Sequence, residues 1–493
     1  MLLNKEDEVK HLIEEIDKNE LTSKSLESDK GVRKQLFEKV ETYSEDFLDK
    51  LLELNTYETT GYEPSIKDSG FLIAEKGNPI EPTLNFLKER VDSTGLNPAS
   101  GGHLGYIPGG SIFESALGDY MAAISNRYAG VFYASPGAVR MENTLLRWAA
   151  QLVGYPKDFG GNITSGGSLA NLIAFSTARK AKNIRGADIH RTVIYVSQQS
   201  HHCIWKAIQT CGMEEAVIRN IEMDDHYRMD PKALKAQIQK DREEGLIPFI
   251  LISTAGSTDV GAIDPLKSLS EICQRENLWF HVDGAYGGFF LLTDYGKERM
   301  QGIELADSVV LDPHKGLFLP YGIGMVLVKD MEHLKAANSY QANYMQDTKA
   351  HQEEVSPADL SPELSKHFRG LRMWLPLKLH GTEKFKACLN EKLGLASYFN
   401  TEVQKIGFNT LAEHDLSVVV FRYVPNGKDA EAFNSDLAKY IQEDGRIFIS
   451  TTRLDGKFML RAAILSFRTH RKEVDLLLSL LREFIERWKM ESV

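Results

Sequence analysis

Residues 308–324 read SVVLDPHKGLFLPYGIG and place Lys315 between two apolar runs. The first run, 308–311, is short and rich in β-branched residues, which predicts a buried strand. A lysine is seldom found inside a protein unless a partner compensates for the loss of its hydration. Lys315 therefore needs a chemical reason to follow directly after a buried strand.

Further apolar runs occur between about residue 160 and about residue 330, and longer amphipathic segments separate them. Such alternation predicts an α/β fold in which helices cover a mostly parallel central sheet. The additional runs are TVIYV (192–196), PFILIS (248–253), LWFHV (278–282) and GMVLV (324–328).

The chain is long enough for more than one folding unit. Its 493 residues predict about three units, one of them large. Residues 1–110 start with apolar positions at helical spacing, which predicts amphipathic helices that form either a surface layer or a dimerisation arm. Residues 111–380 are expected to form the large α/β domain. In residues 381–493, helical stretches alternate with strand-like runs, which predicts a smaller α+β domain.

Composition and charge argue against several classes of protein. The chain is 42% hydrophobic and 26% charged, as in a globular protein, and its formal net charge of −11 argues against nucleic acid as a partner. No apolar stretch approaches the roughly 20 residues of a spanning helix. Four scattered cysteines show no C-x-x-C pair, so neither disulfides nor a structural zinc site is expected. We therefore expect a cytoplasmic protein without a membrane partner.

Chemically capable side chains follow the predicted strands. Ligands in open α/β sheets bind beyond the carboxyl ends of the strands, so these side chains are expected to meet. Each one alone has a structural explanation, such as a turn cap or a buried histidine, but their recurrence predicts one site. They are His201 and His202 after 192–196, Thr254 after 248–253, Asp283 after 278–282, and Lys315 after 308–311.

A predicted helix start adds a seat for an anion. In TSGGSLANL (164–172), Gly166, Gly167 and Ser168 precede a helical pattern. Unpaired N–H groups and the helix dipole favour a bound anion at such a terminus. The motif alone is more often a simple cap, but beside the strand-end residues it predicts a phosphate in the same site.

This combination of groups meets the requirements of pyridoxal 5′-phosphate (PLP). A lysine amine can form a Schiff base with the cofactor aldehyde, for which the pocket is expected to lower its pKa. A carboxylate at the pyridine nitrogen keeps that nitrogen protonated. A nicotinamide cofactor fits less well, because no G-x-G-x-x-G lies between a strand and a helix. Zinc also fits less well, because the candidate ligands match no zinc motif; they are His201, His202, His281, His314 and Asp283.

The chain resembles the group II PLP-dependent decarboxylases of fold type I, the family of the aromatic-L-amino-acid, histidine and glutamate decarboxylases. The resemblance spans most of the chain in the family's order, and its most specific part is HVDGAYGG together with DPHK. The matching stretches are 134–156, 164–172, 197–207, 253–265, 281–288, 312–316 and 367–381.

The resemblance implies roles for individual residues. Lys315 would be the Schiff-base lysine, Asp283 the partner of the pyridine nitrogen, and His201 the ring that stacks on the cofactor. His314 would lie beside the lysine as a proton relay. The other implied cofactor contacts are Gly167 and Ser168 at the phosphate, Ala285 on the ring face opposite His201, and Thr254 nearby.

Substrate contacts are less well defined by the resemblance. Gly102 and His103, in GGHLGYIPGG, stand where aromatic-specific members carry bulky residues, so a roomier and more polar pocket is expected. His103 and Tyr106 are candidate substrate contacts. Arg461 matches a position where glutamate decarboxylases bind the substrate carboxylate, and a structural salt bridge is its alternative role. An aromatic substrate is therefore one option.

Two positions depart from the family pattern. Asp312 stands where the family often has Asn, and a carboxylate near a phosphate is unfavourable unless it points away or is paired. We therefore leave Asp312 out of the cofactor residues. The family's loop tyrosine, which is thought to protonate the reacting carbon, corresponds to Pro357 without a gap, and Tyr340 and Tyr344 lie upstream.

The function implied by the resemblance is PLP-dependent decarboxylation of an L-amino acid, by a homodimer with its site near the interface. Because the loop tyrosine is not matched, the main alternative is an aldehyde synthase, followed by a carbon–carbon lyase. A PLP-binding homologue without activity belongs to a different class. Lys315, Asp283 and His201 argue against it, because packing alone requires none of them.

Overall fold

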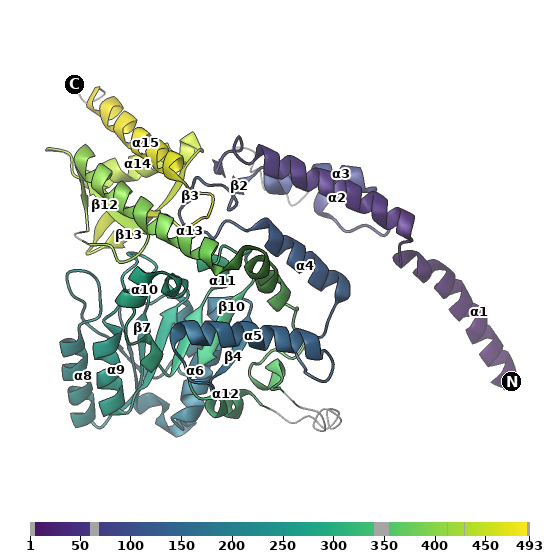
Figure 1. The fold of residues 1–493 in the computed structure, drawn as a ribbon, viewed down its shortest axis with the longest axis horizontal. Coiled ribbons are helices and arrows are strands. Elements are labelled where there is room, and N and C mark those ends of the chain that lie inside the picture. The colour runs from purple at the N-terminus through teal and green to yellow at the C-terminus, as the bar shows by residue number, and fades with distance from the viewer. Residues whose placement is uncertain (1–4, 60–68, 340–353, 412, 428, 491–493) are drawn as a thin grey trace. The chain divides into compact units, whose positions relative to one another are not determined.

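The computed structural model describes residues 5–59, 69–339, 354–411, 413–427 and 429–490 (Figure 1). The chain forms two compact units, one of residues 1–54 with 58–97 and the other of residues 55–57 with 98–493. In the described ranges, no helix combines the length and apolar character needed to cross a membrane.

The first unit is mainly helical, as predicted for the start of the chain. Asp29 caps its second helix, because the carboxylate accepts a hydrogen bond from the Val32 N–H. Four apolar residues of its first helix share one stripe, and each is more than half exposed; they are Val9, Leu12, Ile13 and Ile16. The elements are α1 (Lys5–Ser23), α2 (Lys30–Lys50), α3 (Ile80–Leu87) and β2 (Gly95–Leu96), and β1 (Tyr57–Glu58) spans the junction of the two ranges.

A seven-stranded sheet forms the centre of the second unit, and it confirms the predicted α/β fold. Five neighbouring strands are parallel, and β10 runs antiparallel to both of its neighbours. The order across the sheet is β4 (Gly160–Thr164), β10 (Gly324–Val328), β9 (Ser308–Leu311), β8 (Trp279–Gly284), β7 (Ile247–Thr254), β5 (Thr192–Val196) and β6 (Val217–Asn220).

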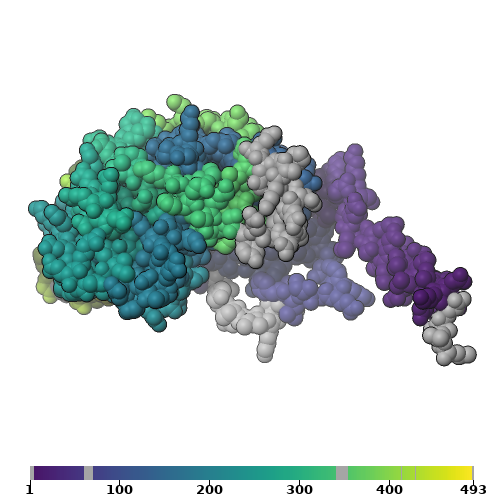
Figure 2. All heavy atoms as spheres, turned by 90° about the horizontal axis from the view of Figure 1, so that it is seen from below, coloured from purple at the N-terminus to yellow at the C-terminus, as the bar shows by residue number. Residues whose placement is uncertain are grey.

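Helices cover both faces of this sheet, which explains why its strands read as continuous apolar runs. In β5, Val193 and Tyr195 pack into one core, and Ile194 and Val196 pack into another core on the opposite face. The first core is covered by α5 (Pro136–Val153), α8 (Pro231–Glu243) and α9 (Leu266–Glu276), and the second by α6 (Gly167–Ala181), α7 (Cys203–Thr210) and α12 (Met331–Asn338). In the space-filling view, side chains from the blue through green part of the chain form one continuous surface (Figure 2).

A second sheet of five strands contains the strand-like runs predicted near the end of the chain. Its strand order is β11 (Phe408–Thr410), β12 (Val418–Tyr423), β14 (Lys457–Ala463), β13 (Phe448–Leu454) and β3 (His103–Leu104). A separate apolar core joins it to α14 (Ala430–Asp444) and α15 (Arg471–Met490).

The remaining helices of this unit are α4 (Phe113–Ser125), α10 (Asp294–Arg299), α11 (Pro313–Gly316) and α13 (Gly370–Ile406). Helix α13 crosses the predicted boundary between residues 380 and 381, and Gly381 interrupts its helical geometry there with a φ of 67°. The division at residues 110 and 380 stays a prediction.

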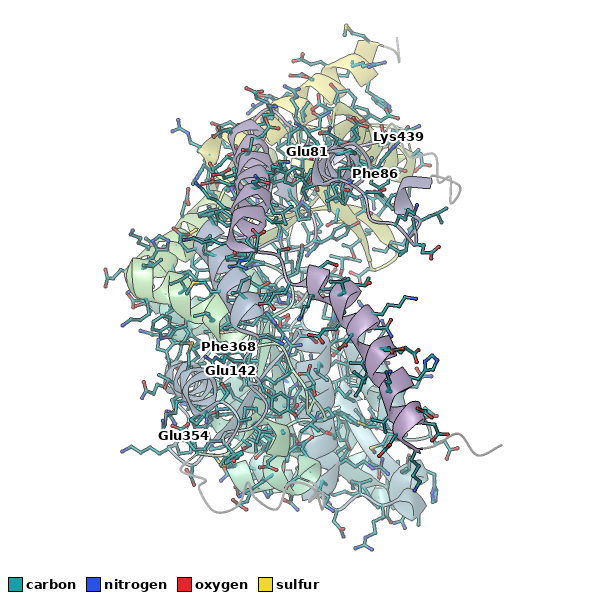
Figure 3. All side chains as sticks on the ribbon, turned by 90° about the vertical axis from the view of Figure 1, so that its right-hand side faces the viewer. Glu81, Phe86, Glu142, Glu354, Phe368 and Lys439 are labelled. Atoms are coloured by element: carbon teal, nitrogen blue, oxygen red, sulfur yellow. The ribbon has the colours of Figure 1, made fainter. Side chains whose placement is uncertain are left out.

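A buried ion pair fixes the segment that precedes α13. Lys366 Nζ lies 2.8 Å from Glu142 Oε2, and both side chains are at most 1% exposed. The same ammonium donates to Asn162 Oδ1 and to the Ile163 carbonyl, each at 3.1 Å. Glu142 also accepts from the Gly370 N–H at 3.0 Å, and Figure 3 shows it beside Phe368. Because a buried charge is stable only when paired, this cluster ties the segment to α5 and β4.

Candidate active site

The strand-end residues meet in one cavity of about 360 Å³ at the carboxyl edge of the parallel strands. Adjacent strands β9, β8, β7 and β5 end on the same side, and Thr254 of β7 lies directly opposite Asp283 of β8 in the sheet register. All eight residues expected to contact the cofactor line this cavity: Gly167, Ser168, His201, Thr254, Asp283, Ala285, His314 and Lys315.

The start of α6 forms one wall of the cavity. Within the described chain, the N-cap residue Gly166 makes no side-chain capping bond, so the first N–H groups of the helix remain available to a ligand. A Cβ atom at Gly167 would lie only 2.9 Å from Asp312 Oδ2 and 3.3 Å from Ala285 Cβ. Position 167 therefore requires glycine, because a larger residue would collide with Asp312.

Asp283 is held by two donors at the base of the cavity. Its Oδ1 accepts from the Ala285 N–H at 3.0 Å, and its Oδ2 accepts from Asn171 Nδ2 at 3.1 Å. The side chain of Asn171 lies one turn into α6 and also lines the cavity. Asp283 is thus fixed as a hydrogen-bond acceptor.

Lys315 and Asp312 form an ion pair, with 3.1 Å between Nζ and Oδ2 and 24% of the lysine side chain exposed. Burial alone would lower the pKa of Lys315, but the carboxylates of Asp312 and Asp283 outweigh burial and raise it. The expectation that the pocket lowers this pKa is therefore wrong for this arrangement, because two carboxylates favour the ammonium form.

Asp312 lines the cavity although it was left out of the cofactor residues. A carboxylate near a phosphate was expected to be unfavourable unless it is paired, and Asp312 is paired with Lys315. His314 Nε2 lies 3.6 Å from the same carboxylate. His314 Nδ1 donates to the Ile323 carbonyl, which directs Nε2 towards Asp312, and burial lowers the pKa of His314.

His201 and His202 occupy different environments. His201 is half-buried in the cavity wall, and its Nδ1 accepts from the Cys203 N–H at 3.3 Å. Burial is the main cause that lowers its pKa, and neighbouring His202 and Lys315 lower it further, whereas Asp283 acts in the opposite direction. His202 is exposed, and its ring centroid lies 4.0 Å from that of His201.

The three candidate substrate residues lie outside the cavity as lined by the described residues. His103 is fully buried against Tyr106 and Phe448, whereas Tyr106 is 62% exposed. A Cβ atom at Gly102 would come within 2.2 Å of the Arg446 carbonyl, so this glycine serves close packing.

Arg461 is buried beside the cavity wall. Its guanidinium donates to the Asp259 carbonyl at 3.0 Å, to the Gly105 carbonyl at 2.6 Å and to Ser450 Oγ at 2.7 Å. Its NH2 group has no hydrogen-bond partner among the described residues. Thr258, the neighbour of Asp259, lines the cavity.

Some cavity residues were missed by the sequence reasoning. Among them are Asn171 and Gln199, and within the described chain the buried Gln199 Oε1 has no hydrogen-bond partner. The sequence could have predicted Asn171 as a cavity residue, because it lies four residues after Gly167 and therefore on the same face of the predicted helix. Gln199 sits in an irregular loop, where no periodicity indicates which side chains point inwards.

The segment expected to supply the loop proton donor is only partly described. Pro357 is buried, and its carbonyl accepts from Asn162 Nδ2 at 2.7 Å. Tyr340 and Tyr344 lie outside the described residues.

The zinc hypothesis finds no matching geometry. Among the residues that the structure describes, no group of three His, Cys, Asp or Glu side chains is arranged to hold a metal ion. His281, one of the candidate ligands, instead bonds to Ser308 and Asn171 in the core.

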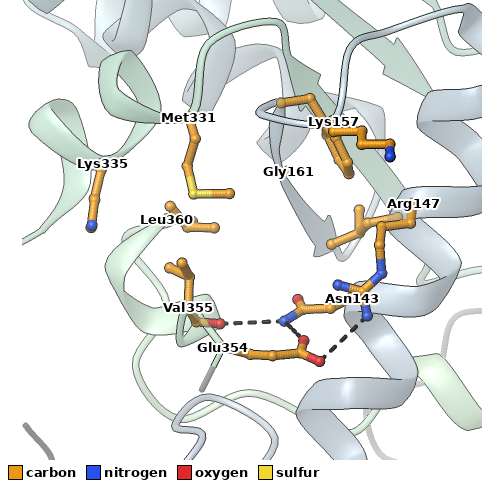
Figure 4. Close-up of a pocket in the computed structure, with 11 residues that line it drawn as sticks. Asn143, Arg147, Lys157, Gly161, Met331, Lys335, Glu354, Val355 and Leu360 are labelled. Carbon is orange, nitrogen blue, oxygen red and sulfur yellow. Dashed lines mark hydrogen bonds and ion pairs between the residues drawn. The ribbon is translucent and has the colours of Figure 1, made fainter. Parts of the chain in front are cut away.

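A second cavity, of about 390 Å³, lies beside α5 and α12 (Figure 4). Asn143 Nδ2 donates there to Glu354 Oε2 at 2.6 Å, and Arg147 donates to Glu354 Oε1 at 3.4 Å. None of the predicted site residues lines this cavity within the described chain. It is marginally larger than the first cavity, but the chemically capable set lies in the first.

The chain belongs to the family described as the pyridoxal-dependent decarboxylase conserved domain, which matches residues 100–424. The aromatic-L-amino-acid decarboxylase of Bacillus atrophaeus is 33% identical over 82% of this chain and 85% of its own length. The phenylacetaldehyde synthase of Arabidopsis thaliana is 30% identical over 75% of this chain and 78% of its own. Family membership confirms the predicted family, the PLP cofactor and the enzyme class, an amino-acid carboxy-lyase.

A solved structure confirms the fold. The crystal structure of Oryza sativa TDC with PLP and tryptamine matches with a TM-score of 0.88 at 23% identity, over 93% of this chain and 99% of that chain.

The residues of the first cavity fit PLP. Its volume falls within the range of ligand pockets. The N–H groups at the start of α6 suit a phosphate, and the buried Gln199 Oε1 offers a hydrogen-bond acceptor without a partner among the described residues. A lysine, a fixed carboxylate and a half-buried imidazole complete the set of groups that the cofactor requires.

We predict that the free energy of unfolding decreases as the pH falls from about 6.5 to about 4.5. Burial lowers the pKa of His103 and of His281 to about 4. Unfolded histidines titrate near 6.5, so in this window the unfolded chain binds protons that the folded chain excludes, which favours unfolding. Each histidine contributes up to about 1.4 kcal/mol per pH unit.

Urea unfolding across this pH window measures the loss. In His103→Asn, Oδ1 can replace Nδ1 as the acceptor of the Gly105 N–H, so this variant serves as the control with one fewer buried titrating ring. Its pH dependence should be shallower than that of the parent. A parent stability that does not change between about pH 6.5 and about pH 4.5 contradicts the account.

Proposed function

We propose that this chain removes the carboxylate of an aromatic L-amino acid and releases the amine and CO₂. The observation that carries the proposal is the convergence of Lys315, Asp283 and His201 on one cavity beside the start of α6. The name of the Bacillus atrophaeus relative supports an aromatic side chain. The absence of a candidate membrane span among the described helices is compatible with the cytoplasmic location that we propose.

Each group of the cavity has a place in holding the cofactor. The amine of Lys315 would bond to the cofactor aldehyde, and Asp283 would accept a hydrogen bond from the protonated pyridine nitrogen. The first N–H groups of α6, at Gly167 and Ser168, would hold the phosphate. His201 and Ala285 would cover the two faces of the ring, and Thr254 would lie at its edge.

When bound, PLP accepts the electron pair that stays on Cα after CO₂ leaves. The chain's own residues direct this chemistry by placing charge and moving protons. Lys315 Nζ and His314 Nε2 both face Asp312, at 3.1 Å and 3.6 Å. This cluster can pass a proton to the reacting carbon, because the carboxylate stabilises whichever neighbour is charged.

Arg461 stays the proposed partner of the substrate carboxylate, although its guanidinium lies behind the cavity wall and not among the described lining residues. Its uncompensated NH2 group suits an anion, because a buried guanidinium without a carboxylate partner gains most from a charge-assisted hydrogen bond. Its three bonds to the chain would orient the group, as in a preorganised binding site.

The second candidate function is an aldehyde synthase. The observation that favours it is Pro357, which is buried and offers no proton donor where the family loop carries a tyrosine. The resemblance to the phenylacetaldehyde synthase supports this alternative. Without a donor, the reacting carbon would be open to oxidation by O₂.

We also propose that the enzyme is a homodimer. Helix α4 exposes a row of large apolar side chains at helical spacing, each at least 40% exposed: Phe113, Leu117, Tyr120, Met121 and Ile124. The stripe on α1 is exposed as well. Exposed apolar stripes of this kind are typical of surfaces that bind another chain.

The products distinguish the two candidate functions. The PLP-loaded protein is mixed with a panel of L-amino acids, and CO₂, amine, aldehyde, ammonia and peroxide are measured together. We expect aromatic substrates to yield amine in an amount equal to CO₂, and Lys315→Ala to yield neither. Aldehyde, ammonia and peroxide in place of amine would establish the aldehyde synthase, and no turnover across the panel would contradict both.

Arg461→Gln should raise KM for the substrate by about tenfold to a hundredfold, the cost of one charge-assisted hydrogen bond, and change kcat less. Steady-state kinetics measure this separation, and Arg461→Lys, which keeps the charge, should recover part of the loss. A variant with unchanged KM and reduced stability would assign Arg461 to structure alone.

The dimer proposal is tested by sedimentation velocity. The parent should sediment at about twice the chain mass of 55.5 kDa, and the double variant Leu117→Glu with Met121→Glu should shift towards the monomer. Ala236→Glu, on the exposed side of α8, is the matched control and should remain dimeric. A monomeric parent would contradict the proposal.

A further inference from the structure

We propose that a buried chain of hydrogen bonds, running from Trp279 through Ser308, His281 and Asn171, positions Asp283 and fixes it as the acceptor for the cofactor's ring nitrogen. This inference rests on the proposed function, because it presupposes the role of Asp283. It gives a positioning role to Asn171, which lines the cavity, and to three side chains behind it, those of His281, Ser308 and Trp279.

The hydrogen bonds form a continuous chain from Trp279 to Asp283. Trp279 Nε1 lies 2.9 Å from Ser308 Oγ, and this oxygen lies 2.8 Å from His281 Nδ1. His281 Nε2 lies 2.7 Å from Asn171 Oδ1, and Asn171 Nδ2 lies 3.1 Å from Asp283 Oδ2. All five residues are at most 7% exposed. The steps among Trp279, Ser308 and His281 lie in the interior, and the last step, from Asn171 to Asp283, lies in the cavity wall.

Burial lowers the pKa of His281 to about 4, and for the neutral ring only one assignment of the hydrogens satisfies every step. The Asp283 carboxylate accepts, so the amide nitrogen of Asn171 must face it and Oδ1 must face His281. His281 Nε2 therefore carries the proton and Nδ1 is the acceptor, which makes the Ser308 hydroxyl a donor. The indole N–H of Trp279 can only donate, and it completes the sequence. Every hydrogen bond thus points towards Asp283.

The fold explains why these residues meet. Trp279, His281 and Asp283 alternate along β8, so their side chains lie on the same face of the strand. Ser308 belongs to the neighbouring strand β9, where it pairs with His281 in register. Asn171 comes from α6, which covers this face. The spacing W-x-H-x-D is therefore one side of a single strand.

A chain of donors aimed at one carboxylate has a specific electrostatic effect. Aligned hydrogen bonds polarise one another, and in a low-dielectric interior they stabilise the negative form of the terminal acceptor. Burial keeps His281 neutral by lowering its pKa to about 4. The histidine thus supplies a donor without placing a second full positive charge beside the cofactor.

The test compares two substitutions at His281. Gln places an N–H donor near the position of Nε2 and keeps an acceptor, whereas Leu has a similar volume and neither group. The apoprotein of each variant is titrated with PLP, and ring-¹⁵N-labelled PLP reports by NMR whether the bound ring nitrogen is protonated.

We expect His281→Leu to raise the PLP dissociation constant by about tenfold to a hundredfold, comparable to the loss of outer partners in metal sites. The ¹⁵N signal should shift towards the unprotonated position, and His281→Gln should stay close to the parent in both measurements. If His281→Leu matches the parent in both, the inference is wrong. If the Leu variant does not fold, Ser308→Ala takes its place, because it is a smaller change one step further from Asp283. Ser308→Ala should shift both readouts in the same direction.

Asp283→Asn separates failure of this inference from failure of the proposed function. If the ring nitrogen stays protonated in Asp283→Asn, the proposed role of Asp283 fails, and the inference fails with it. If Asp283→Asn loses the proton while His281→Leu and Ser308→Ala keep it, only the hydrogen-bond chain is overturned.

Discussion

The charge of Lys315 is the constraint on which the rest of the site depends. An ammonium that is largely shielded from water is stable only where carboxylates or other acceptors replace its hydration. Asp312 lies 3.1 Å from its Nζ, and Asp283 lines the same cavity and contributes to its raised pKa. Asp283 lies at the carboxyl end of β8 and Asp312 directly follows the neighbouring parallel strand β9. The sheet that creates the buried position therefore also supplies the opposite charges.

Helix α6 joins two halves of the site that the sheet alone could not connect. Its first turn offers N–H groups to an anion, and Asn171, one turn later, bonds to Asp283 at 3.1 Å. One rigid element therefore fixes the distance between the proposed phosphate site and the carboxylate. Sites built on such elements hold their geometry more closely than sites built on loops.

The sequence predicted what depends on local patterns. The strands at 192–196 and 324–328 have the predicted bounds, because both are apolar runs enclosed by polar or turn residues. It could not reveal that β10 is antiparallel to its neighbours, or that β3 pairs with β13, since these depend on contacts distant in the chain. The eight residues proposed to contact the cofactor line one cavity because the strands that they end or follow finish at the same edge of the sheet. Asp312 was left out because a carboxylate is unfavourable near a phosphate unless it is paired, and its pairing with Lys315 depends on the three-dimensional geometry.

The central claim is that Lys315 is the residue that bonds to the cofactor. The PLP-loaded protein can be reduced with borohydride and digested, and the modified peptide identified by mass spectrometry. The account predicts a pyridoxyl group on Lys315, within DPHKG, and on no other lysine. A reduced protein labelled at a different lysine, or not labelled at all, would contradict the account.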